Sequence, residues 1–569
     1  MNLNGEWNFA FDFSQSGFEK GWQTDPSAMN KKITVPFCPE SKLSGIEYTD
    51  FIPAIWYHRT FQVPAEWNGS RMFLHFGAVD YDCRVWVNGV LAGRHYGGSA
   101  SFVFEITHAL KNGENDVIVY AVDDIRSGNQ PSGKQSNRYE SYSCFYTRTT
   151  GIWQTVWLEA RPESYIENVR IIPDLDNGRF VLTPVFQNIR KGLVFKATLL
   201  SAEGQELNSV KSVPVNGVPM PVDIKKPRAW SPDDPYLYEL KYELIEDNKV
   251  IDRVDSYAGL RKFHIEGNRF FLNNKPIFLR LILDQGFYPD GIWTAPDDKE
   301  LKADIERSLA IGFNGARLHE KVFEERFHYW ADKLGYLTWG EFYDWEIFST
   351  NHEGMKNLQR EWTEVILRDL NHPSIITWTP FNERAETNME INRLAVQTVL
   401  DVTRAIDPTR PLNDASGYVH VDTDIFSVHD YDQKPETFFE RYDSLSAETN
   451  TAYLLYPELS EAYDGQPYVV DEYGGTHWSE DFATQSPHPG DRVWEWGKGK
   501  KAEEIEETIE VLTQILLNNP EISGFCYTQL TDVEQEINGL YTYDRKPKFN
   551  NTNLKRIFSA PAAIEKIEY

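Results

Sequence analysis

The chain has 569 residues, too many for a single hydrophobic core, so two to four domains are expected. Its 86 acidic and 57 basic residues give a formal net charge of −29, which makes nucleic acid and anionic membrane surfaces poor partners. No apolar run approaches the roughly 18 to 20 residues of a membrane span, so we expect no membrane partner.

The start of the chain, MNLNGEWNFAFD, has no basic region followed by an apolar one and therefore shows no export signal. The four cysteines lie far apart and form no CxxC pair, which argues against a zinc site or a disulfide framework. We expect a cytoplasmic protein without a metal or cofactor. A periplasmic or secreted location stays open if a signal peptide was removed.

Residues 1–160 alternate short apolar strands with turns. Met72, Leu74 and Phe76 alternate with neighbours on the opposite face, and the Asn88-Gly89 pair is typical of a tight hairpin. Residues 161–258 continue the pattern in shorter units separated by Asn-Gly, Gly and Pro turns. The first segment therefore predicts an antiparallel sandwich, and the second suits an immunoglobulin-like sandwich.

From residue 259 to residue 569, strand-like runs alternate with stretches that carry apolar residues at helical spacing. The expected helices lie within 297–312, 357–370, 391–406 and 503–518. The strand candidates are 278–284, 315–320, 336–341, 376–383, 411–416, 426–431, 468–474 and 524–530. Eight strands in a segment of this length predict a (β/α)8 barrel.

Almost every predicted barrel strand ends in polar or ionisable residues, and the carboxyl ends of barrel strands meet at one mouth. Glu383 ends the fourth strand and Glu472 the seventh, so the two are expected to face each other. Glycoside hydrolysis uses two such carboxylates, whose pKa values proximity should separate. Carboxylates in barrel mouths also hold metals or form salt bridges, so spacing alone leaves the two interpretations about equal.

The sequence also resembles glycoside hydrolase family 2, which includes β-galactosidases, β-glucuronidases and β-mannosidases. The segments that carry the resemblance follow in the family's order: GEWNFAFD, VWVNGVLAGRHYGGSASFVFEIT, GIWQTVWLE, WSPDDPYLYEL, GNRFFLNNKPIFLR, ARLHE, TWTPFNE and VVDEYGG. The resemblance implies a multidomain β plus α/β protein. Its parts would be a jelly-roll β-sandwich similar to sugar-binding domains at 1–160, an immunoglobulin-like β-sandwich at 161–258 and a catalytic TIM barrel at 259–569.

The resemblance also implies roles for single residues. Glu383 would be the general acid/base and Glu472 the nucleophile, while Asn382 would bind the sugar 2-hydroxyl. The remaining substrate-binding residues that it implies are His319, Tyr431 and Tyr527. These three could also simply satisfy buried hydrogen-bonding networks.

Two further positions are ambiguous in a different way. Glu341 could form a salt bridge as easily as it could bind sugar. Asp471, which precedes the nucleophile, should point to the opposite face of its strand and is interpreted as structural.

Two segments depart from the family. LILDQGFYPDGIWTAPDD follows the first barrel strand where many β-galactosidases have an Arg-His-Glu stretch, so Asp284 is expected to do different work in the sugar pocket. EQEINGLYTYDRKPK places Glu536 where β-glucuronidases hold the substrate carboxylate with an Asn-x-Lys element. A uronic acid facing Glu536 would bind poorly unless Arg545, Lys546 or Lys548 intervenes.

These observations predict an exo-acting retaining β-glycosidase that hydrolyses terminal non-reducing sugars by double displacement. A neutral sugar is favoured, with a β-galactosidase-like activity first. The alternatives are a β-glucuronidase or arabinosidase of the same family, or a catalytically idle glycan-binding member. The expected partner is a carbohydrate substrate, and a homo-oligomer is possible.

Overall fold

The structure, a computed structural model, describes residues 1–386, 388–479, 497 and 500–566. The chain divides into two compact units. The first unit comprises 1–124, 149–262 and 367–373. The second comprises 125–148, 263–366 and the described residues from 374 onward. Within the described part of the chain, no helix is both long enough and apolar enough to cross a membrane.

The N-terminal part of the first unit is an antiparallel β-sandwich. Its strands are β1 (Gly5–Phe11), β2 (Lys31–Val35), β3 (Ile55–Gln62), β4 (Arg71–Phe76), β5 (Val79–Asp80), β6 (Asp82–Val87), β7 (Val90–Tyr96), β8 (Phe102–Glu105), β9 (Glu114–Val122), β10 (Gly151–Ile152) and β11 (Val156–Arg161). A sheet in the order β2-β1-β3-β9-β6-β7 is accompanied by the sheets β11-β4-β8 and β10-β5. Met72, Leu74 and Phe76 are buried in the core between them, as the alternation predicts.

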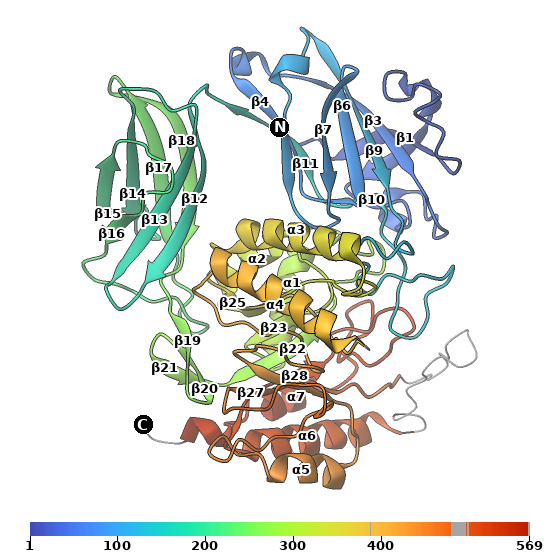
Figure 1. Ribbon diagram of the computed structural model, residues 1–569, viewed down its shortest axis with the longest axis vertical. Coiled ribbons are helices and arrows are strands. Elements are labelled where there is room, and N and C mark those ends of the chain that lie inside the picture. Colours follow the sequence, from blue (N-terminus) through green and yellow to red (C-terminus); the bar gives the residue numbers. More distant parts are fainter. Residues whose placement is uncertain (387, 480–496, 498–499, 567–569) are drawn as a thin grey trace. The chain divides into compact units, whose positions relative to one another are not determined.

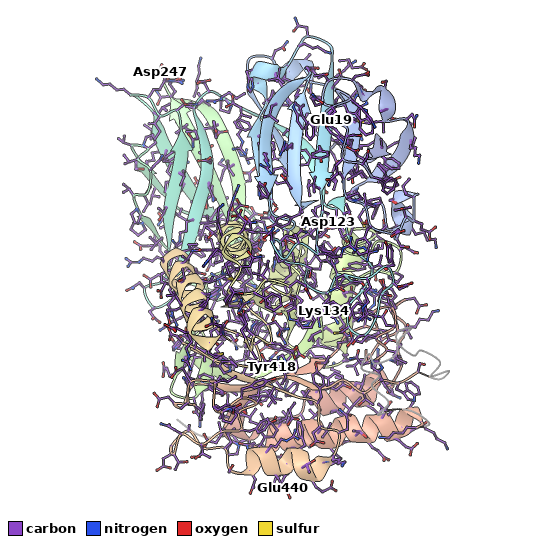
Figure 2. All side chains as sticks on the ribbon, turned by 45° about the vertical axis from the view of Figure 1, so that its right-hand side comes forward. Glu19, Asp123, Lys134, Asp247, Tyr418 and Glu440 are labelled. Carbon is purple, nitrogen blue, oxygen red and sulfur yellow. The ribbon has the colours of Figure 1, made fainter. Side chains whose placement is uncertain are left out.

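A second sandwich follows within the same unit (Figure 1). Its strands are β12 (Tyr165–Asp174), β13 (Arg179–Gln187), β14 (Val194–Leu200), β15 (Glu206–Ser212), β16 (Met220–Asp223), β17 (Tyr238–Glu246) and β18 (Lys249–Ala258). They form the sheets β12-β13-β16 and β15-β14-β17-β18. Strict alternation along β13 buries every second side chain in a separate core. Figure 2 shows Asp247 at the tip of the β17–β18 hairpin, where Asp247 and Asn248 both have positive φ.

The second unit contains the parallel barrel. After a small sheet of β19 (Phe263–Glu266), β20 (Arg269–Leu272) and β21 (Lys275–Ile277), the barrel strands are β22 (Leu279–Asp284), β23 (Gly315–Leu318), β24 (Leu337–Glu341), β25 (Ile375–Thr379), β26 (Phe426–Asp430), β27 (Tyr468–Gly474) and β28 (Ile522–Thr528). The helices are α1 (Asp298–Ala310), α2 (Glu325–Leu334), α3 (His352–Asp369), α4 (Met389–Ile406), α5 (Pro435–Asp443), α6 (Ala502–Asn518) and α7 (Asn551–Phe558). The strands pair in the order β25-β24-β23-β22-β28-β27-β26.

The predicted fifth strand, 411–416, differs from the prediction. It forms only isolated parallel bridges, Trp378 with Leu412 and Asn382 with Ser416. On its other side it bonds mainly through side chains, since the Asn413 amide donates to Ser427 Oγ over 2.8 Å. The segment therefore lies between β25 and β26 without a regular ladder, and seven strands pair in the described sheet.

Residues 125–148 leave the N-terminal sandwich and belong to the second unit. They contain no helix or long strand, but backbone hydrogen bonds fix them. Ser132 N donates to Trp345 O over 3.1 Å, and Tyr146 N donates to Lys134 O over 2.7 Å. This segment consequently reaches the carboxyl ends of the barrel strands, which the sequence did not predict.

Candidate active site

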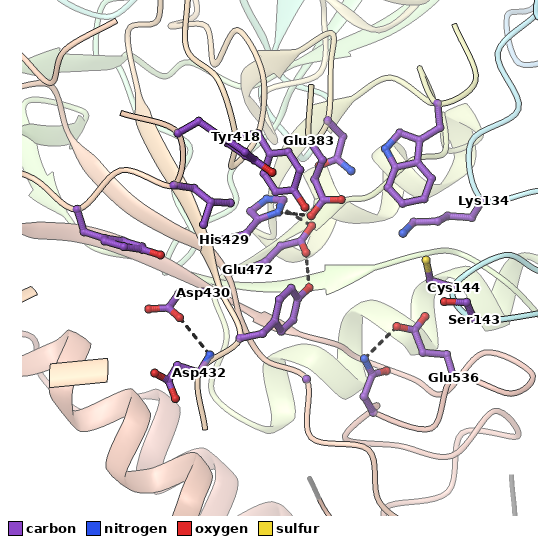
Figure 3. A pocket seen from close by; sticks show the side chains of 18 of the residues that line it. Lys134, Ser143, Cys144, Glu383, Tyr418, His429, Asp430, Asp432, Glu472 and Glu536 are labelled. Atoms are coloured by element: carbon purple, nitrogen blue, oxygen red, sulfur yellow. Dashed lines mark hydrogen bonds and ion pairs between the residues drawn. The ribbon is translucent and has the colours of Figure 1, made fainter. Parts of the chain in front are cut away.

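A cavity of about 680 Å³ lies at the carboxyl ends of the barrel strands. Residues from the ends of β25, β26 and β27 line it, together with loop residues from 125–148 and from the segment after β28 (Figure 3). Figure 2 places Lys134 and Tyr418 among the packed side chains of this unit, whereas Glu440 lies at its margin on α5. The cavity therefore combines barrel residues with residues from far earlier in the chain.

Glu472 lies on β27 and is held by a buried arginine. Arg317, on β23, is fully buried and donates to Glu472 Oε1 over 2.7 Å. The same guanidinium pairs with Glu341 Oε2 over 2.5 Å and donates to Asn382 Oδ1 over 2.8 Å. One rigid cation thus fixes the orientation of three side chains that the sequence singled out.

The surroundings of Glu472 keep it ionised. Burial by itself raises the pKa of this carboxyl, but the positive charges of His429 and Arg317 lower it further than burial raises it, so the pKa lies well below its ordinary value. The hydroxyl group of Tyr431, after β26, also donates a hydrogen bond to Glu472 Oε2. Glu472 is therefore a negative, hydrogen-bonded carboxylate in the cavity wall.

Glu383 is presented to the cavity by an unusual backbone conformation. Its φ is 48°, in the left-handed region that non-glycine residues rarely adopt, and its amide donates to Ser416 O over 2.9 Å. The side chain is 21% exposed, and its Oε1 accepts a hydrogen bond from His429 Nδ1 over 2.8 Å. The strained turn points the carboxylate into the cavity, and His429 sets its orientation.

Glu383, His429 and Glu472 form a tight cluster. Each contributes one oxygen or nitrogen atom, and these atoms all lie within 4.8 Å of one another. Such a group could hold a metal ion through its hard oxygen and imidazole ligands. The same spacing brings the two carboxylates close enough to act on one substrate bond.

The other end of the cavity contains Glu536, which is 7% exposed. Its Oε2 accepts a hydrogen bond from the Tyr146 hydroxyl and a longer one, of 3.3 Å, from the Gln285 amide. Its Oε1 accepts from Asn538 Nδ2 over 3.1 Å. Burial raises the pKa of Glu536, and Lys134 and the Tyr146 donor oppose that rise.

Lys134 lies on the cavity wall nearby and is 7% exposed. Its ammonium group stands over the Trp345 ring, 3.9 Å from the centroid. Burial lowers the pKa of Lys134, but interactions with Cys144, Glu536 and Glu383 raise it to about 12. Lys134 is therefore charged at neutral pH.

The structure brings five of the nine predicted site residues to the cavity wall. They are Asn382, Glu383, Tyr431, Glu472 and Glu536. His319 and Glu341 lie behind the wall, where His319 Nδ1 is 3.9 Å from Glu472 Oε1. Burial, followed by the charges of Lys134 and Arg317, holds the pKa of His319 well below its ordinary value, so the ring is neutral.

Asp284 and Tyr527 are not among the residues that line the cavity. Asp284 accepts a hydrogen bond from Gly286 N over 2.9 Å, and its pKa is raised to about 6 by burial and then by Asp304. Tyr527 is 1% exposed and packs edge-on against Tyr473. The sequence also missed Lys134, Trp345 and Tyr418, because loop residues carry no periodicity that assigns them to a barrel mouth.

The three basic residues that the sequence offered as partners for a uronate carboxylate form ion pairs with other acidic residues. Arg545 Nη2 pairs with Asp304 Oδ2 at 3.2 Å, and Lys548 Nζ pairs with Asp532 Oδ1 at 2.8 Å. Lys546 is exposed and pairs with Asp544. None of these three basic residues lines the cavity.

Comparison with protein families matches nearly the whole chain to three domains. The descriptions are the sugar-binding domain of glycosyl hydrolases family 2 at residues 1–162, glycosyl hydrolases family 2 at 164–261, and the family 2 TIM barrel domain at 263–561.

Individual relatives carry two different names. A β-galactosidase of Thermoanaerobacter pseudethanolicus is 26% identical over 468 residues, covering 76% of this chain and 58% of that protein. A β-glucuronidase of Paenibacillus borealis is 25% identical over 438 residues, covering 72% of each. The chain thus spans less than two thirds of the first relative's length.

Solved structures show the same fold. The β-glucuronidase from Ruminococcus gnavus in complex with D-glucuronic acid superposes with a TM-score of 0.81 at 21% identity, covering 98% of this chain and 97% of that one.

Proposed function

Because the chain belongs to glycosyl hydrolase family 2, we propose that it is an exo-acting retaining β-glycosidase with Glu472 as nucleophile and Glu383 as general acid/base. The proposal rests on the short distance between the two carboxylates. An oxygen of Glu383 and an oxygen of Glu472 lie within 4.8 Å in one cavity. Retaining enzymes place their carboxyl groups about 5 to 5.5 Å apart, whereas inverting enzymes leave about 6.5 to 9.5 Å for a water molecule.

The surroundings of Glu472 suit the role of nucleophile. The positive charges of His429 and Arg317 keep Glu472 ionised, as a nucleophile must be. It attacks the anomeric carbon, while Glu383 protonates the glycosidic oxygen and the bond to the leaving group breaks. Glu383 then takes a proton from water, which attacks the anomeric carbon and releases Glu472 and the sugar.

Two neighbours support these steps. Asn382 lies beside Glu383 with its Oδ1 held by Arg317, so its amide is oriented for a sugar hydroxyl. The Asn382 Nδ2 is buried and has no hydrogen-bond partner among the described residues. A bound 2-hydroxyl group would satisfy this donor and stabilise the transition state.

We propose a neutral sugar as substrate and test a β-galactoside first. Arg545, Lys546 and Lys548 are tied up outside the cavity, and the Glu536 carboxylate faces its interior. The second candidate is a β-glucuronidase, which the naming of relatives such as the Paenibacillus borealis enzyme favours. Measuring kcat/KM on a panel of 4-nitrophenyl glycosides distinguishes the two candidates. If the glucuronide has the highest kcat/KM, the protein is a β-glucuronidase and not an enzyme for neutral sugars.

Alanine variants test the roles. Glu472→Ala should lose nearly all turnover whatever the leaving group, because no glycosyl-enzyme can form. Glu383→Ala should damage alkyl glycosides far more than aryl glycosides with a good leaving group, because protonation matters most for poor leaving groups.

Azide distinguishes the two variants further. It should rescue Glu383→Ala through a β-glycosyl azide, while any azide product from Glu472→Ala should have the α configuration. The opposite pairing of products would exchange the two roles. A wild-type protein that binds sugars but hydrolyses none of the panel would support the catalytically idle alternative.

A further inference from the structure

Lys134 is a buried cation whose ammonium group has no hydrogen-bond acceptor among the described residues. Its side chain is over nine-tenths buried, yet no hydrogen bond or ion pair joins its ammonium group to any residue that the structure describes, and its contact is the face of Trp345. A buried ammonium group without an acceptor is costly unless something else completes its hydrogen bonds. Figure 3 shows it pointing into the cavity, so the missing acceptors belong to whatever occupies that space.

Glu536 is the complementary group. Tyr146, Gln285 and Asn538 all donate hydrogen bonds to its carboxylate, which fixes its orientation. Its carboxylate forms no ion pair with Lys134, although both line the same cavity, so the two charges stand more than 4.0 Å apart. A space with a fixed donor on one side and a fixed acceptor on the other remains between them.

We infer that Lys134 and Glu536 together recognise the sugar, with the ammonium donating to one oxygen and the carboxylate accepting from a hydroxyl group. This inference rests on the proposed function and names the chemistry that selects its substrate. A hydroxyl group both donates and accepts, so neutral sugars satisfy both residues at once. A uronate would face the like charge of Glu536, and an amino sugar would face that of Lys134.

Glu536 therefore disfavours a uronate, and Lys134 disfavours an amino sugar. Selection by an unfavourable contact is as effective as selection by a favourable one. The mutual influence of the two groups supports their proximity, since Glu536 raises the pKa of Lys134 and Lys134 opposes the rise in the pKa of Glu536.

The local backbone places Lys134 accurately. Gly133 has a φ of +54°, and a Cβ atom there would meet the backbone oxygen of Glu320 at 2.6 Å. Only glycine fits this approach, and the bond from Tyr146 N to Lys134 O ties the segment on its other side. A surface lysine would need no such positioning.

Two charge-neutralising variants test the inference. Kcat/KM is measured at pH 6 for 4-nitrophenyl β-galactoside, β-glucuronide and β-glucosaminide with the wild type, Glu536→Gln and Lys134→Gln. Glu536→Gln should raise the glucuronide-to-galactoside ratio at least about tenfold, because a like-charge contact is removed. Lys134→Gln should lower that ratio and raise the glucosaminide-to-galactoside ratio by a similar factor.

Lys546→Gln and Asp544→Asn are matched controls, since this pair carries the same charges outside the cavity. Both should leave all ratios within about twofold of the wild type. Equal loss on all three substrates in Glu536→Gln and Lys134→Gln, with unchanged ratios, would overturn the inference.

A binding readout separates failure of the selection from failure of the proposed function. Titration calorimetry with galactose, glucuronate and glucosamine measures the same preferences without catalysis. Unchanged preferences in folded variants would refute the role of the pair even if turnover is absent. Shifted preferences in a protein that hydrolyses nothing would retain the pair and refute only the glycosidase.

Discussion

Tyr431 donates a hydrogen bond to Glu472, the proposed nucleophile. Tyr431→Phe removes a donor to the charged form, so the pKa of Glu472 should rise. A hydrogen bond to a charged group contributes about 1.5–3 kcal/mol, which corresponds to about one to two pKa units. We therefore expect the acid limb of the kcat/KM profile to move to higher pH by that amount.

Tyr453→Phe is the control for this experiment. Tyr453 also lines the cavity, but no hydrogen bond joins its hydroxyl to Glu472. The acid limb of the kcat/KM profile of Tyr453→Phe should coincide with that of the wild type. Coincident acid limbs for Tyr431→Phe and the wild type would show that Arg317 and His429 keep Glu472 ionised without the help of Tyr431.

At the level of residues, the sequence predicts the site residues near strand ends but not the site residue in a loop. Glu383 follows β25 and Glu472 lies near the carboxyl end of β27, so their convergence follows from barrel geometry. Lys134 lies in the stretch SGNQPSGKQSNRYE, whose glycine, serine and asparagine content predicts only a loop. Its partner Glu536 is separated from it by most of the chain, and no local pattern encodes such a contact.

The segment 125–148 acts as one structural element, and Gly133 is where it is most tightly constrained. Gly133→Ala adds a Cβ that would lie 2.6 Å from Glu320 O and 3.0 Å from Tyr343 Cβ, so the segment must shift. We expect kcat/KM to fall roughly tenfold to hundredfold, because displacements of about 1 Å in a binding element cost that much. The measurement is kcat/KM on the best neutral glycoside.

Gly267→Ala is a close match, since Gly267 has a φ of +58° but no atom within 4 Å of an added Cβ. It carries the same backbone strain without the collision. Its kcat/KM should stay near that of the wild type. Equal losses in both variants would assign the effect to strain in general instead of to the position of Lys134.

The segment 411–416 shows that a sequence pattern predicts the presence of a strand better than it predicts a regular hydrogen-bond ladder. PLNDAS was expected to be a strand, and its place in the barrel is as expected. Asn413 and Asp414 use their side chains to bond neighbouring backbone and hydroxyl groups, in competition with a continuous ladder. Short polar side chains in a strand candidate are therefore the signal for an irregular edge.

For the molecule as a whole, two compact units can respond separately to pH. Glu40, in the first unit, is 2% exposed, and burial raises its pKa to about 8. Between the ordinary carboxyl pKa and about 8, the folded state holds a proton that the unfolded state has lost. The free energy of unfolding should consequently fall as pH rises through this window, by up to about 1.4 kcal/mol per pH unit.

Glu40→Gln removes this titration, so its advantage over the wild type should grow from pH 5 to pH 8 and then level off. Urea unfolding at several pH values measures the difference. Glu66→Gln, at an exposed position in the same unit, is the control. Parallel stability profiles for Glu40→Gln and the wild type would contradict the raised pKa.

The assignment of 125–148 to the barrel unit has a consequence for how such a protein can change. Mutations or insertions more than a hundred codons upstream of the two proposed catalytic glutamates could alter the accepted sugar while leaving the reaction chemistry untouched. A recombination junction near residue 262 would exchange this segment together with the sandwiches, and a chimera built there would inherit the sugar preference of its N-terminal parent.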